Sequence, residues 1–160
     1  NSGYRLWVIG YRMMEEKEFS FEGLSVYKSA RQLVRDIYVL QHQFPKYEIY
    51  ALGDQVRRSA SSITSNIAEG SGRSSFKEKS HFVEIAYGSL MEAYSQLQIA
   101  QDLGYLSQEQ LFGIKPQFIQ VAKMLSGLKG YFDKKKSSNP NEQPLPSFSD
   151  SHPNTITNNQ

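Results

Sequence analysis

Apolar residues recur at alternating steps of three and four along two long stretches of this chain. This spacing places them on one face of an α-helix, and such a face must be buried against other elements. The first stretch ends before Pro45, because a proline disfavours the helical conformation in the residue that precedes it. Pro116 falls in the second turn of the other stretch, so this helix either starts near Lys115 or carries an early kink. The first face comprises Val26, Ala30, Leu33, Ile37, Leu40 and Phe44, and the last comprises Leu111, Ile114, Phe118, Val121, Leu125, Leu128 and Phe132.

Two further helices are predicted between these stretches, over about 49–69 and 75–103. Gly70 and Gly72 end the first of them in the manner of a glycine C-cap. Ser75 is a plausible N-cap for the second, with Glu78 three residues on, as in a capping box, and Gly104 ends that helix. Four amphipathic helices with short connections predict an all-α, up-down-up-down four-helix bundle.

The 160 residues divide into a folded body and two flanking segments. The helical pattern predicts a body over 21–132. Residues 133–160 contain four of the six prolines among Ser and Asn, and so predict a disordered tail. Residues 1–20 are interpreted as an N-terminal arm or as a remnant of sequence upstream of Met13 and Met14. No run approaches the roughly 20 apolar residues of a membrane span, and we expect a cytoplasmic protein with no membrane partner.

The amino-acid composition excludes several kinds of catalytic and metal-binding site. The chain has no cysteine, three histidines and a formal charge of +2, so it offers no thiol nucleophile and no Cys-ligated metal. The pair Glu78 and His81 has the spacing of a di-iron half-site, but a second such pair is missing from the sequence. No His lies at helical spacing from the serines of 59–65. We therefore expect no enzyme activity, no metal and no cofactor.

The helix over 75–103 carries two apolar stripes. One is the core stripe, and the second consists of Tyr87, Met91 and Tyr94. The second stripe is either ordinary amphipathic surface or the interface of a homo-oligomer, and we favour the interface. Small residues over 59–68 face Ala86, Gly88, Ser89, Ala93 and Ala100, which predicts close packing of these two helices.

Basic residues gather near the connection between the second and third helices. On one chain they form an ordinary charged surface, but repeated around a ring they would form a basic belt that engages phosphates. The candidate nucleic-acid-binding residues are Arg57, Arg58, Arg73, Lys77 and Lys79. Asn66, Glu69 and Glu92 look like polar residues near the bundle interior.

Residues 55–70, QVRRSASSITSNIAEG, closely resemble the "RRA-x-S-I-x-x-N-I-A-E-G" signature of a bacterial four-helix-bundle family known from intervening sequences in large-subunit ribosomal RNA genes. Residues 82–93, FVEIAYGSLMEA, are similar to its "F-L-x-I-A-x-G-S-L-x-E" block. Residues 21–27 and 103–105 look like its opening and its "LGY" turn.

This resemblance implies a homopentameric ring without enzyme activity. In a related branch, the accessory proteins of diversity-generating retroelements, the ring binds nucleic acid and a reverse transcriptase. The motif residues Asn66, Glu69, Gly70, Gly88 and Glu92 are then assigned to packing and assembly.

Two functional hypotheses follow. In the first, the chain is a non-enzymatic oligomeric protein that binds RNA, DNA or a nucleoprotein partner through its basic outer surface. In the second, it is a protein-only scaffold or adaptor without nucleic-acid affinity.

Overall fold

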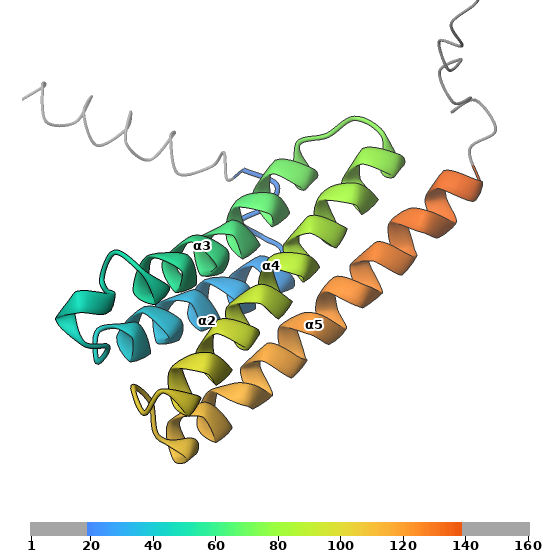
Figure 1. Ribbon diagram of the computed structural model, residues 1–160. Helices are drawn as coiled ribbons and strands as arrows, with labels where there is room; N and C mark the ends of the chain where they lie inside the picture. The colour runs from blue at the N-terminus through green and yellow to red at the C-terminus, as the bar shows by residue number, and fades with distance from the viewer. Residues whose placement is uncertain (1–18, 139–160) are drawn as a thin grey trace, which may run out of the picture.

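The computed structural model describes residues 19–138. They form four long helices, α2 (Ser25–Gln41), α3 (Leu52–Ser71), α4 (Phe76–Asp102) and α5 (Gln108–Ser137), with a short 3-10 helix η1 (Lys46–Glu48) before α3. Each long helix packs on two neighbours, because α2 contacts α3 and α5 while α4 contacts the same two helices from the other side (Figure 1). The predicted all-helical four-helix fold is confirmed, and the described residues contain no strand.

The core consists of the predicted helical faces. Leu33, Ile37, Ile63, Leu90 and Leu125 are fully buried at its centre. Phe82, at the start of the core stripe of α4, is half-buried, and the rest of that stripe is buried. The periodicity therefore identified the inward faces of the first and the last helix, α2 and α5.

Several boundaries differ from the predicted ones. Helix α2 ends at Gln41, not at Phe44, although Phe44 remains buried in the following turn. Helix α3 begins at Leu52 and not near Ile49, because η1 and a turn occupy the intervening residues. Its C-cap is Gly72, as predicted, although a φ of −82° shows that this glycine is not in the left-handed conformation. Gly104, by contrast, has a φ of +78° directly after α4, as expected for a glycine that ends a helix.

Helix α5 is longer than predicted at both ends. It begins at Gln108, where Ser107 and Gln110 form a reciprocal capping box, and it continues past Pro116. It also continues through Lys134, Lys135 and Lys136 to Ser137, so the predicted start of the disordered tail at residue 133 is wrong. The remainder of that predicted tail, from 139, and residues 1–18 of the predicted arm lie outside the described residues.

Helices α3 and α4 are in close contact at Gly70. A Cβ atom at this glycine would lie 2.7 Å from the Cβ of Phe82, which is too close for any side chain. Further along, Ser59 donates a hydrogen bond to Gln96 at 2.7 Å, and the small residues Ala60, Ala86 and Ala93 are fully buried. The predicted close packing of these helices is thus confirmed at Gly70.

Candidate nucleic-acid interface

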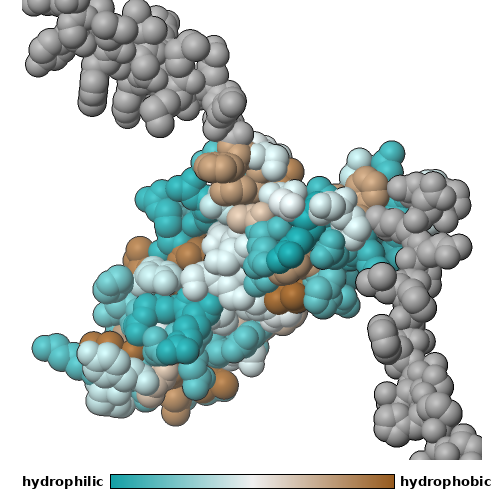
Figure 2. All heavy atoms as spheres, turned by 90° about the horizontal axis from the view of Figure 1, so that it is seen from above, coloured by the Kyte–Doolittle hydropathy of each residue, from teal (hydrophilic) through white to brown (hydrophobic). Residues whose placement is uncertain are grey.

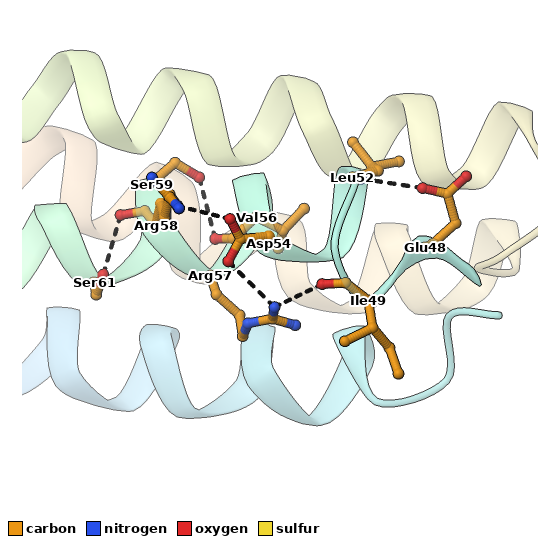
Figure 3. A network of polar contacts seen from close by, with 9 residues as sticks. All are labelled: Glu48, Ile49, Leu52, Asp54, Val56, Arg57, Arg58, Ser59 and Ser61. Atoms are coloured by element: carbon orange, nitrogen blue, oxygen red, sulfur yellow. Dashed lines mark hydrogen bonds and ion pairs between the residues drawn. The ribbon is translucent and has the colours of Figure 1, made fainter. Parts of the chain in front are cut away.

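Arg57 and Arg58 lie in the second turn of α3 and both engage Asp54. The Arg57 guanidinium donates to Asp54 at 3.3 Å and to the carbonyl of Ile49 at 2.7 Å, so it ties the preceding turn to the helix (Figure 3). Arg58 donates to the other Asp54 oxygen at 2.7 Å, and 80% of its side chain is exposed. One carboxylate therefore balances part of the charge of both arginines.

Arg73, Lys77 and Lys79 lie at the connection between α3 and α4. Arg73 pairs with Glu69 and stacks over the ring of Phe82 at 4.5 Å. Lys79 donates to the carbonyl of Ser71 at 3.2 Å and thereby satisfies an acceptor at the end of α3. Lys77 is exposed.

The five predicted cations do not form one patch. Helix α3 rises 1.5 Å per residue, so about 20 Å of helix separates Arg57 from the end of α3 where Arg73 lies. Within one chain the five cations are therefore divided into a pair of arginines and a group of three at the opposite end of α3, and the basic belt predicted for a ring stays a prediction.

The last turn of α5 adds cations that sequence reasoning placed in the tail. Lys134, Lys135 and Lys136 are exposed there. They lie at the same end of the bundle as the α3–α4 connection (Figure 1), and cations at a helix C-terminus are favoured by the helix dipole. We call the set Arg73, Lys77, Lys79, Lys134, Lys135 and Lys136 the basic end.

Asp133 joins α5 to α4 at this end. Ser80 donates to one of its oxygens at 2.6 Å, and Lys129 donates to the other at 2.9 Å. These hydrogen bonds, the one from Ser80 first, lower the pKa of Asp133 below its ordinary value. Asp133 in turn holds the pKa of Lys129 above its usual range. The carboxylate therefore stays ionised at neutral pH, and its hydrogen bond from Ser80 links α5 to α4.

The motif residues divide into two groups. Gly70 is buried in the α3–α4 contact, and half-buried Asn66 donates to the carbonyl and the hydroxyl of Ser62 at 2.8 and 2.9 Å. Glu69, Gly88 and Glu92 are exposed, which corrects the expectation that the two glutamates lie near the interior. A Cβ at Gly88 would meet no atom within 4 Å, so the predicted packing of Gly88 against α3 is also wrong.

The second apolar stripe of α4 borders a groove. Tyr87 and Met91 are 38% and 41% exposed, whereas Tyr94 is half-buried with its ring 5.1 Å from that of Phe118. Together with Ile119 and Ala122 of α5 they line a depression of about 510 Å³. We call it the α4–α5 groove. Figure 2, which shows one face of the bundle, has its apolar side chains in separate patches on a largely hydrophilic surface.

Within 19–138, no three His, Asp or Glu side chains are placed together so that they could hold a metal ion. Ser75 caps α4, as predicted, because its hydroxyl accepts a hydrogen bond from the backbone N–H of Glu78. The Glu78 carboxylate accepts a hydrogen bond from the same hydroxyl, and His81 lies beside Phe82. No helix in this part of the chain is long and apolar enough to cross a membrane.

These features define a small all-helical protein of the four-helix-bundle class. Residues 22–127 match the model of the 23S rRNA-intervening sequence protein family, and the chain belongs to that family. The match covers all of α2, α3 and α4 and most of α5, and it confirms the resemblance read from the motifs. No curated protein matches the chain.

Proposed function

We propose that this protein is a non-enzymatic binding protein that assembles with copies of itself and attaches to nucleic acid through the basic end. The observation that carries the proposal is the collection of like charges where α4 begins and α5 ends. The family, named for an intervening sequence of 23S rRNA, is compatible with an RNA-related role.

The geometry of this end concentrates positive charge. Because α4 and α5 are antiparallel, the hydrogen bond between Ser80 and Asp133 marks equal heights on the two helices. Lys77 lies three residues before Ser80 and Lys136 three residues after Asp133, so both continue toward the same end of the bundle. Like charges that share one surface repel each other, and a polyanion relieves this repulsion.

Neutralising the basic end tests the proposal. The variant Lys77→Gln/Lys135→Gln/Lys136→Gln removes three charges while glutamine keeps a similar helix propensity. Binding of a fluorescent RNA duplex is measured by anisotropy over a range of salt concentrations. Each phosphate contact that is lost should reduce the slope of log K against log salt by about 0.9 and weaken binding at low salt. The control is Arg35→Gln, an exposed arginine in the middle of α2.

Two results oppose the proposal. If the wild-type protein does not bind the duplex at low salt, the hypothesis of a protein-only scaffold is favoured. A triple variant with the affinity and salt slope of the wild type would show that the basic end is not the binding surface.

Self-assembly is the second part of the proposal, and the α4–α5 groove supports it. Its exposed Tyr87, Met91 and Ile119 form an apolar surface that a second copy would cover, and the family resemblance implies a ring of five. Met91→Glu should lower the mass measured by light scattering, because a charge buried without a partner is costly. Ile99→Glu, equally exposed on α4 but outside the groove, is the control. A wild-type chain with the mass of a monomer would contradict this part.

A further inference from the structure

The connection between α2 and α3 presents two tyrosines to solvent. We call residues 45–51 the aromatic turn. Within it Tyr47 is 74% exposed and Tyr50 is 91% exposed. Large rings this exposed bury little apolar surface in the bundle, so the fold of a single chain gives Tyr50 in particular no packing role.

The aromatic turn is nevertheless held by several contacts with the start of α3. Arg57 of α3 donates to the carbonyl of Ile49 at 2.7 Å, and Glu48 accepts a hydrogen bond from the backbone N–H of Leu52 at 3.0 Å (Figure 3). A Cβ at Gly53 would lie 2.7 Å from the carbonyl oxygen of Glu48, so the turn and the start of α3 are in tight contact.

A third attachment comes from the α4–α5 connection. The Tyr105 hydroxyl donates to Glu48 at 3.0 Å, and the Tyr47 hydroxyl lies 3.5 Å from that of Tyr105. The two rings meet edge to face at 6.3 Å, and the ring of Tyr105 rests on buried Phe44 at 5.8 Å. One face of this cluster is therefore anchored in the core while Tyr50 and much of Tyr47 remain outside.

Two cations belong to the turn and to the helix turn that supports it. Lys46 is exposed within the aromatic turn itself. Arg58 pairs with Asp54, which also pairs with Arg57, and Arg57 donates to the carbonyl of Ile49 in the turn. The 80% exposure of the Arg58 side chain leaves its guanidinium open to a further ligand. Exposed aromatic rings in a region that also carries cations are a pattern with which proteins hold single-stranded nucleic acid, because every base offers a face for stacking and every phosphate a negative charge.

We propose that the aromatic turn is a stacking site for unpaired bases, with Tyr50 and Tyr47 as the platforms and Lys46 and Arg58 beside the sugar-phosphate chain. The proposal rests on the proposed function, since it names the kind of nucleic acid that a second surface of the same protein holds. This surface lies at the opposite end of the bundle from the basic end (Figure 1). The two surfaces should thus respond to different substitutions.

Substitutions at Tyr50 test the stacking site, because this side chain can be changed with little effect on the fold. Full-length protein is titrated into a fluorescent 12-nucleotide oligouridine and, separately, into an RNA duplex. Tyr50→Leu keeps an apolar side chain but lacks a flat face, and Tyr50→Phe keeps the face. Tyr50→Leu should weaken single-strand binding about 5- to 150-fold, the range for the loss of one stacked base, whereas Tyr50→Phe should bind like the wild type. Duplex affinity should be unchanged in both variants.

The salt dependence separates this site from the basic end. Tyr50→Leu should lower the affinity for oligouridine at every salt concentration without changing the slope, because stacking releases no counterions. Thermal unfolding of each variant checks that the bundle is intact.

Three results would overturn the inference. Equal oligouridine affinity for Tyr50→Leu and wild type would refute stacking while leaving the proposed function intact, provided that the duplex is bound. Equal losses in Tyr50→Leu and Tyr50→Phe would show that the hydroxyl and not the ring face is used. A wild-type protein that binds neither probe would refute the inference and the proposed function together, and would point to a protein ligand at the turn.

Discussion

Replacing Gly70 with alanine should destabilise the bundle, although alanine favours helix more than glycine does. The new Cβ would lie 2.7 Å from the Cβ of Phe82, whereas ordinary contacts begin near 3.4 Å. The Phe82 atom is fixed to the backbone of α4, so only a shift of one helix relieves the clash. Overpacking of this kind costs about 1–3 kcal/mol, and the gain in helix propensity is at most about 1 kcal/mol. The expected net loss is therefore up to about 2 kcal/mol.

Gly88→Ala is the matched control for this change. It also replaces a helical glycine, but a Cβ there meets no atom within 4 Å. It should raise stability by up to about 1 kcal/mol, because only the propensity changes. Thermal unfolding at one protein concentration compares the variants, since assembly makes the midpoint concentration-dependent. The unfolding midpoint should fall in Gly70→Ala and rise in Gly88→Ala, by roughly 4 °C per kcal/mol. A Gly70→Ala protein that gains as much stability as the Gly88→Ala protein would refute the close approach of α3 and α4.

Two further predictions concern pH. Because the pKa of Asp133 is lowered, its carboxylate stabilises the fold above the ordinary carboxyl pKa, and this contribution is lost as the pH falls through the lowered value. In the variant Asp133→Asn, the free energy of unfolding measured with urea should therefore fall less steeply toward acid pH than in the wild type. Hydrogen bonding with Tyr47, partial burial and the hydrogen bond to Glu48 raise the pKa of Tyr105, so its contribution is present below pH 10 and lost as the pH rises above it. Tyr105→Phe should be less stable than wild type at neutral pH, and the gap should narrow above pH 10. A constant gap would contradict the hydrogen bond to Glu48.

The core could be predicted from the sequence because, in an amphipathic helix, the apolar residues at helical spacing are the ones that become buried. Leu33, Ile37 and Leu125 are inward at the spacing that identified them. The turn at 45–51 could not be read in this way. Its shape depends on contacts with Arg57 and Tyr105, and Tyr105 lies more than fifty residues away in sequence. Local patterns carry no information about such a contact.

The candidate site was predicted less well, for reasons that are partly visible in the sequence. Asp54 precedes Arg58 by four residues and Glu69 precedes Arg73 by four, which is the spacing of ion pairs on one helix. This spacing predicts that a carboxylate balances part of the charge of each arginine. Lys134 was assigned to the predicted tail because the residues after 136 are rich in Pro, Ser and Asn. Yet a run of lysines is favourable in the last turn of a helix, and α5 ends there.

The two parts of the proposed function depend on each other through multivalency. One chain carries a formal charge of only +2, and carboxylates such as Glu69 and Asp133 lie among the cations of its basic end. A single basic end would therefore make few phosphate contacts and bind weakly at physiological salt. Copies joined through the α4–α5 groove would present several such ends to one strand, and each contact after the first would form at a high effective concentration. Met91→Glu leaves every cation of the basic end unchanged, so a loss of duplex affinity together with the loss of assembly would show this coupling. Unchanged affinity in a monomeric Met91→Glu protein would show that one basic end is sufficient.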